Sequence, residues 1–306
     1  MYSRLALLAL AISWTSAAQD IVADVRAAIA RNDFAAGESL IAKSKSAHGI
    51  TPEMIEAVSW LGRGSLAAKN YDNAYKYAEQ ARELSLEQLK RRKLDAETHL
   101  PLALGASIEV QAHVMAAKGE RSEAVAFLRR ELQTYHATSI RTRIQKNLHL
   151  LSLEGKPAPA LDIKSWLGPK PVPLAQLKGK PVILYFWAHW CSTCKQQAPD
   201  LVKLVAEYAP QGLVVIGPTQ HYGYTTNMPE ATPSQETPHI DAIRKQFYGT
   251  LPSMSVPISE ENLKNYGVST TPTLVFVDPK GIVQVYHPGK MTYTELVAGM
   301  KKILAD

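Results

Sequence analysis

The sequence predicts an all-helical half followed by an α/β half in which a mixed sheet is flanked by helices. Residues 21–153 contain few prolines and no strand-like alternation, and their alanines and leucines recur at helical spacing. Prolines and glycines then cluster in residues 155–181, which marks a domain boundary near residue 154. Beyond this cluster, short apolar runs alternate with helical stretches, as expected for an α/β fold.

The first 18 residues have the composition of a cleavable secretory signal. Arg4 precedes an apolar run from Leu5 to Trp14, and small residues follow up to Ala18, where we expect cleavage. A membrane anchor is the alternative, but the run is shorter than the roughly 20 apolar residues that span a bilayer. No other segment is expected to cross a membrane. We therefore predict a signal peptide (1–18), a helical domain (19–154) and an α/β domain (155–306) in a periplasmic or secreted protein.

The helical half contains three short stretches that resemble one another: Asn32–Ile41, Lys69–Ala78 and Gly119–Leu128. The middle one resembles a tetratricopeptide repeat, because Gly62, Ala74 and Ala81 supply small side chains where two antiparallel helices approach closely. The spacing between the three stretches is irregular, so a helical bundle of no special type is the alternative. A repeat array would offer a surface for a protein partner.

The α/β half divides into strands and helices at turn residues. We expect strands at 182–187, 213–216, 273–277 and 282–286, helices at 191–208 and near 240–247, and a Pro-rich polar loop at 221–239. The formal charge of +6 is spread along the chain, and its densest basic run is 89–95. A solvated helix face explains that run, so no nucleic-acid partner is expected.

The chain has two cysteines, Cys191 and Cys194, three positions apart. A structural staple is disfavoured, because closing so short a loop restricts the unfolded chain little. A zinc site would need two further ligands such as His189 and His221, which have no standard spacing, so no metal is expected. A redox couple fits better. Cys191 follows a buried strand and begins a helix, which favours an exposed thiolate, while Cys194 would be protected and form the disulfide.

The segment PVILYFWAHWCSTCKQQAP resembles the active-site segment of thioredoxin-fold proteins. GKPAP, LKGKP and YGVSTTPTLVFVDPKG resemble the TlpA/ResA-like thiol–disulfide oxidoreductases, so the resemblance covers residues 155–306. It implies that Cys191 is the nucleophile and Cys194 the resolving cysteine, and that Trp190 packs beside them. It also implies that Pro199 kinks the active-site helix.

The same resemblance implies that Pro272 is a cis-proline facing the disulfide and that Thr271 pairs with an extended substrate chain. An ordinary trans proline at the start of a strand is the alternative. Two positions depart from the family pattern, because Tyr185 and Gln197 stand where relatives carry carboxylates. Tyr185, a water or a carboxylate of the 221–239 insertion would then assist the resolving thiol.

Two further side chains are candidates for supporting the site. Lys195 could help set the local potential, with a solvated lysine as the alternative. A protonated His189 would stabilise the thiolate of Cys191, with an exposed, uninvolved histidine as the alternative.

We therefore predict an exported enzyme without a cofactor that reduces disulfides in proteins, with electrons from a membrane donor of DsbD/CcdA type. Cytochrome c apoproteins or copper-site cysteines are candidate substrates. The alternatives are a partner-binding adaptor, a copper-handling or other metal-handling protein, and a disulfide oxidase or isomerase, since direction depends on the reduction potentials of the partners.

Overall fold

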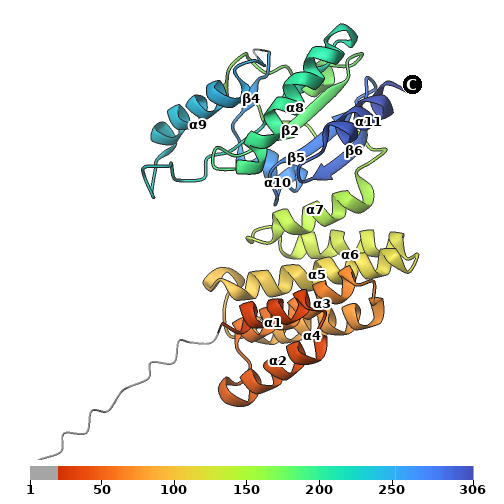
Figure 1. Cartoon of the computed structure of the whole chain (residues 1–306), viewed down its shortest axis with the longest axis vertical. Helices are drawn as coiled ribbons and strands as arrows, with labels where there is room; N and C mark the ends of the chain where they lie inside the picture. Colours follow the sequence, from red (N-terminus) through yellow and green to blue (C-terminus); the bar gives the residue numbers. More distant parts are fainter. Residues whose placement is uncertain (1–19, 252, 306) are drawn as a thin grey trace, which may run out of the picture.

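The structure is a computed structural model that describes residues 20–251 and 253–305. The signal peptide expected at residues 1–18 lies outside these residues. The described chain first forms a series of α-helices and then a mixed sheet with helices around it (Figure 1). The thioredoxin-like α/β architecture expected from the sequence is confirmed, and the N-terminal half is helical.

The helices of the N-terminal half are α1 (Ile21–Ala30), α2 (Phe34–His48), α3 (Pro52–Ala67), α4 (Tyr71–Leu89), α5 (His99–Ala117), α6 (Arg121–Thr134) and α7 (Arg141–Ser152). The first four begin at polar residues whose side chains accept a hydrogen bond from a backbone N–H three residues on: Asp20, Asp33, Thr51 and Asn70. Such N-caps satisfy donors that the helix itself leaves unpaired, so the sequence sets these helix starts locally.

Consecutive helices pack as antiparallel neighbours, and the odd-numbered helices also contact one another in the order α1, α3, α5, α7. Gly62 on α3 permits one close approach, because a Cβ there would lie 3.3 Å from the Ala78 nitrogen and 3.4 Å from the Ala74 oxygen of α4. Gly62 and Ala74, two of the small residues singled out in the sequence, therefore lie where α3 and α4 meet.

Helix α5 corrects one expectation, that no segment after the N-terminus is long and apolar enough to cross a membrane. By length and composition this helix qualifies, with a mean hydropathy of 1.2. Most of it is buried inside the protein, between α3, α4, α6 and α7. A helix that packs on several sides is apolar nearly all round, so it resembles a membrane span in sequence.

The α/β half contains β1 (Trp166–Leu167), β2 (Val182–Phe186), α8 (Ser192–Tyr208), β3 (Val214–Ile216), α9 (Pro233–Tyr248), β4 (Val256–Pro257), α10 (Glu260–Tyr266), β5 (Thr273–Val277), β6 (Val283–Pro288) and α11 (Tyr293–Leu304). The main sheet has the order β3-β2-β5-β6; β3 is parallel to β2, whereas β5 and β6 are antiparallel to their neighbours. Strands β1 and β4 form a separate antiparallel pair.

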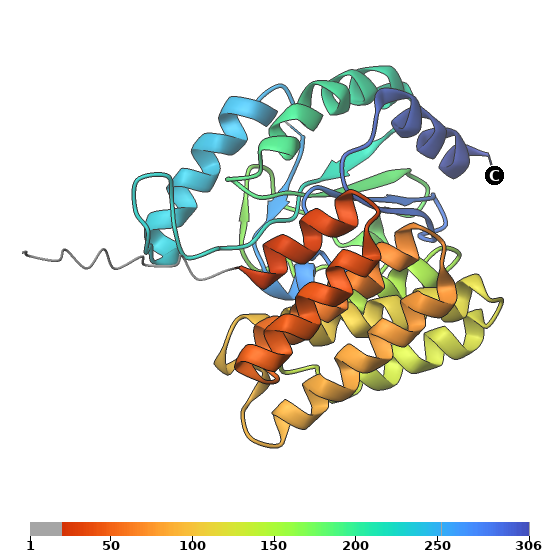
Figure 2. The same ribbon diagram turned by 60° about the horizontal axis from the view of Figure 1, so that its bottom comes forward.

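Strand β2 is buried on both faces, as its continuous apolar run predicts. Ile183 and Tyr185 point into a core shared with α8, α9 and α11, and Leu184 and Phe186 point into a second core that includes residues of α10. Figure 2 shows α8 and α11 on the side of the sheet away from the helical half. Each face of β2 therefore has its own layer of helices.

Helix α9 begins at Pro233, within the stretch that the sequence analysis assigned to a loop. The loop prediction is correct up to Thr232 and wrong for residues 233–239. Thr232 and Gln235 form a capping box, and a proline is favoured in the first turn of a helix. Pro233, which indicated a loop, instead lies at the helix start, and Pro238 lies inside the helix.

The two halves meet where α7 packs against α10. Gly267, just after α10, has a φ of +64°, and a Cβ at this position would lie 2.3 Å from the backbone nitrogen of Lys146. Nearby, the imidazole of His149 hydrogen-bonds through Nε2 to the Asn265 oxygen at 2.8 Å. The halves are therefore in direct backbone contact, and a glycine makes that contact possible.

Candidate active site

Cys191 and Cys194 form a disulfide bond at the start of α8. Cys191 is the N-cap residue, and its Sγ accepts a hydrogen bond of 3.0 Å from the backbone N–H of Cys194. The N-terminus of a helix stabilises negative charge. A thiolate formed at Cys191 would therefore be stabilised by the hydrogen bond from the Cys194 N–H and by the helix dipole. Cys191 is 3% exposed and Cys194 is 0% exposed, so the expected contrast in exposure is small in the disulfide form.

Pro272 lies beside the disulfide although it is 78 positions further along the chain than Cys194. Antiparallel pairing places Thr273, the first residue of β5, opposite Phe186, the last residue of β2. The Thr271–Pro272 peptide bond is cis, which confirms the cis-proline and contradicts the trans alternative. The hydroxyl of Thr193 donates to the backbone carbonyl oxygen of Thr271 at 3.5 Å. The loop before β5 therefore contacts a residue between the two cysteines.

The backbone around Pro272 is fixed from a second side. The N–H of Gly289, which follows β6, donates to the Pro272 oxygen at 2.8 Å. The Thr271 hydroxyl is buried and has no hydrogen-bond partner among the described residues. Pro272, Thr271 and the disulfide therefore lie at the same end of the two central strands, β2 and β5.

Trp190 is the most exposed of the expected site residues. Its side chain is 47% exposed, and its ring meets that of Tyr222 edge to face with the centroids 5.5 Å apart. Tyr222 belongs to the segment that precedes α9, so this segment packs against Trp190, the residue before Cys191. Lys195 is half-buried, with Nζ 5.3 Å from the ring centroid of Phe247 on α9, which differs from a fully solvated lysine.

His189 is buried, which contradicts the exposed-histidine alternative. Its side chain is 2% exposed, and its Nε2 lies 3.1 Å from Oε1 of Glu236, whose side chain is fully buried. Burial lowers the pKa of His189 below its usual value despite the carboxylate beside it, and the His239 and Lys195 charges act in the same direction as burial. A neutral imidazole that donates to Glu236 fits this setting, whereas the sequence hypothesis needed a protonated one.

Glu236 is the functional candidate that the sequence analysis did not name. Besides His189, its carboxylate accepts hydrogen bonds from the backbone N–H groups of Tyr222 at 2.7 Å and Gly223 at 2.8 Å. It is a carboxylate of the 221–239 stretch, where one was expected to assist the thiol of Cys194, but its hydrogen-bond partners are His189 and the backbone of that stretch. The capping box at the start of α9 could have indicated that Glu236 lies on a helix.

Two buried phenols lie beside the backbone of Cys194. Tyr185 and Tyr248 each donate to the Cys194 carbonyl oxygen, at 2.8 and 3.2 Å. Burial raises the pKa of Tyr185 well above its usual value and that of Tyr248 to about 12, so both phenols stay protonated at neutral pH. They fix the first turn of α8 and contact the carbonyl of Cys194 rather than its thiol.

Gln197 is buried and hydrogen-bonds to the backbone of a distant segment. Its Oε1 accepts from the Met291 N–H at 2.8 Å, while its buried Nε2 has no partner among the described residues. Pro199 lies inside α8, as expected. Within residues 20–251 and 253–305, no cluster of three or more His, Cys, Asp or Glu side chains has the arrangement of a metal site, and His221 bonds instead to Thr237.

Known proteins resemble this chain over the α/β half. A family model described as the AhpC/TSA family matches residues 155–286. The thioredoxin-like protein YneN of Bacillus subtilis is 33% identical over 144 residues, which are 47% of this chain and 76% of that protein. The thiol-disulfide oxidoreductase ResA of Bacillus anthracis is 30% identical over 152 residues, or 49% of this chain and 78% of ResA. The thiol:disulfide interchange protein DsbE of Pseudomonas fluorescens is 29% identical over 156 residues, covering 50% and 78%.

Proposed function

The chain belongs to the thioredoxin-like family of thiol–disulfide oxidoreductases, and we propose that it reduces disulfide bonds in other proteins. The observation that carries the proposal is the position of Cys191, which caps α8 beside the cis-proline and is bonded to Cys194. A helix N-terminus lowers the pKa of a thiol, and the neighbouring thiol can then release a bound product.

The reaction starts from the dithiol form. The Cys191 thiolate attacks one sulfur of the substrate disulfide; a bond to Cys191 Sγ forms, the substrate S–S bond breaks, and one substrate thiolate leaves. Cys194 loses its proton and attacks Cys191 Sγ, which forms the intramolecular disulfide and releases the second substrate thiolate. The substrate gains two electrons and takes up two protons, and the enzyme dithiol is oxidised.

We assign supporting roles to the residues around the disulfide. Pro272 and Thr271 would present backbone groups to an extended substrate chain, and Trp190 would contact that chain through its exposed ring. His189 would act through Glu236 by holding the insertion beside the disulfide, and Lys195 would contribute positive charge at the first turn of α8.

The direction of electron flow is part of the proposal. The structure holds the disulfide form, which is the product of the reductive cycle, so each turnover requires renewed reduction by a donor. We propose a membrane-bound dithiol donor of DsbD/CcdA type. A disulfide oxidase would run the same steps in reverse and would need an electron acceptor instead.

Two variants test the mechanism together. Cys191→Ser should abolish insulin reduction in a turbidity assay, and full activity in this variant would overturn the mechanism. Cys194→Ser keeps the attacking thiol and loses the resolving one, so it should accumulate mixed disulfides on Cys191. In the source organism, trapped proteins whose cysteines are normally free would support reduction, and trapped proteins with structural disulfides would support oxidation.

We also propose that the mature protein is exported after removal of residues 1–18. The proposal rests on the apolar run and the small residues before position 19, and on Asp20, which already caps the first described helix. Sequencing the N-terminus of protein from the exported fraction should give Gln19. A chain that retains Met1 would contradict cleavage.

For the helical half we propose a tetratricopeptide-like arrangement that binds a protein partner. Its support is the antiparallel pairing of α3 with α4, the close approach at Gly62, and the contacts among the odd-numbered helices. In proteins built from stacked helical pairs, helices that contact one another along the stack, as the odd-numbered helices do here, provide the binding surface.

A further inference from the structure

Two arginines enclose the indole ring of Trp60 in the helical half. The guanidinium carbon of Arg26, on α1, lies 4.4 Å from the ring centroid, and that of Arg63, one turn along α3 from Trp60, lies 4.2 Å from it. A guanidinium that lies over an aromatic ring keeps its in-plane N–H donors directed outward. We call Arg26, Trp60 and Arg63 the Arg-Trp-Arg cluster.

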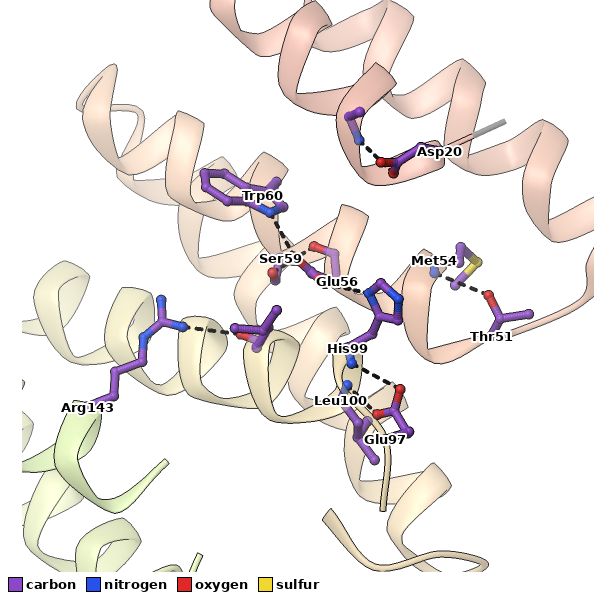
Figure 3. A network of polar contacts seen from close by, with 12 residues as sticks. Asp20, Thr51, Met54, Glu56, Ser59, Trp60, Glu97, His99, Leu100 and Arg143 are labelled. Atoms are coloured by element: carbon purple, nitrogen blue, oxygen red, sulfur yellow. Dashed lines mark hydrogen bonds and ion pairs between the residues drawn. The ribbon is translucent and has the colours of Figure 1, made fainter. Parts of the chain in front are cut away.

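The ring of Trp60 is held in place by a buried carboxylate. Its Nε1 donates to Oε1 of Glu56 at 3.3 Å, and Oε2 of Glu56 lies 2.7 Å from Nδ1 of His99 on α5. Figure 3 shows Trp60, Glu56 and His99 converging from neighbouring helices. Both oxygens of Glu56 are therefore engaged by groups other than the two arginines, and the ring is fixed before any ligand binds.

A third arginine extends the positive charge to α7. Nε of Arg143 donates to Oε2 of Glu109 at 2.9 Å, and Nζ of Lys146 lies 3.5 Å from the same oxygen. Burial lowers the pKa of Arg63 most, and the positive charges of Arg143 and Arg26 lower it further. The negative charges of Glu109 and Glu56 act in the opposite direction. Arg143 and Lys146 thus engage Glu109, and Trp60 and His99 engage Glu56, so neither carboxylate pairs with Arg26 or Arg63.

Arg26 and Arg63 have no ion pair with any carboxylate in the described part of the chain, residues 20–251 and 253–305. Next to Arg143, Leu102 on α5 is 48% exposed, and its backbone carbonyl oxygen accepts from Arg143 at 3.3 Å. The surface therefore combines unpaired guanidinium groups with an exposed apolar side chain, across α1, α3, α5 and α7.

We propose that the Arg-Trp-Arg cluster binds an acidic, extended segment of a partner protein through its Asp or Glu side chains. The planar fork of a guanidinium matches a carboxylate with two parallel hydrogen bonds, and two unpaired arginines can take two such groups. Because Arg26 lies on α1, Arg63 on α3 and Arg143 on α7, a ligand that reaches all three cations must extend over several helices. This binding is separate from disulfide exchange and requires neither cysteine.

The test uses the full-length mature protein and a fluorescein-labelled peptide of alternating Glu and Gly, with binding followed by fluorescence anisotropy at low salt. We expect Arg26→Gln and Arg63→Gln each to weaken binding about tenfold, because each removes charge-assisted hydrogen bonds. Arg26→Lys keeps the charge but loses the planar fork, and should weaken binding at least about threefold. Arg129→Gln, at an exposed position on α6, is the matched control and should leave binding unchanged.

Three results would overturn the proposal. The first is equal affinity for the peptide in which Gln replaces Glu. The second is equal weakening by Arg129→Gln, which would show that only net charge matters. The third is that vesicles of anionic phospholipid or inorganic phosphate, but not the peptide, bind with the same dependence on Arg26 and Arg63. Cys191→Ser should bind the peptide normally, so failure here is distinguishable from failure of the proposed enzymatic mechanism.

Discussion

Replacing Glu236 with glutamine tests whether this buried carboxylate holds the segment before α9 beside the disulfide. The carboxylate accepts from His189, Tyr222 and Gly223, using both oxygens. A glutamine side chain of the same size offers one accepting oxygen and one NH2 group, so at least one of the three donors would face another donor. Losing the acceptor of one largely desolvated donor costs about 1 to 2 kcal/mol.

Hydrogen exchange at the backbone N–H groups of Tyr222 and Gly223 measures this cost directly. A loss of 1 to 2 kcal/mol in the free energy of local opening corresponds to exchange that is roughly five to 30 times faster. Glu230→Gln is the matched control, because Glu230 is an exposed glutamate of the same segment and should leave exchange unchanged. Unchanged exchange at both positions in Glu236→Gln would refute the reasoning.

Other perturbations follow from contacts elsewhere in the chain. Burial would raise the pKa of Glu109, but Arg143, Lys146 and Asn147 outweigh it and hold the pKa at about 2, against 4.5 ordinarily. This depressed pKa stabilises the fold above pH 4.5, and roughly 3 kcal/mol should be lost as the pH falls from 4.5 towards 2. Urea unfolding should show this loss in wild type, and an equal pH dependence in Glu109→Gln would contradict it. Gly267→Ala places a Cβ 2.3 Å from the Lys146 nitrogen at a positive φ, so it should separate the halves. Small-angle scattering and faster proteolysis near residue 154 would report this separation, and an unchanged profile would oppose it. Tyr185→Phe removes one of two hydroxyls that donate to Cys194, and should lower the free energy of unfolding by only about 1 kcal/mol because Tyr248 remains. A loss above about 3 kcal/mol would contradict that redundancy.

The sequence determined the elements whose signals are local. The apolar run of β2 predicted a strand buried on both faces, and the polar N-caps Asp33 and Asn70 begin helices because they satisfy nearby N–H groups. The spacing of Cys191 and Cys194 after that strand predicted the redox pair. The same local reasoning fails at α9, because Pro233 in its capped first turn and Pro238 inside the helix are both residue types that predict a loop.

Tertiary structure decided the environment of the disulfide. Pro272 lies beside Cys191 because β5 pairs with β2 in one register, and Glu236 meets His189 because α9 packs against α8, across 47 positions of sequence. The burial that keeps His189 neutral and the Arg-Trp-Arg cluster likewise arise from packing between separate elements. Periodicity and capping act over a few residues, so they can be recognised in the sequence. The desolvation and the charges that shift a side chain's pKa depend instead on which distant side chains the fold brings together.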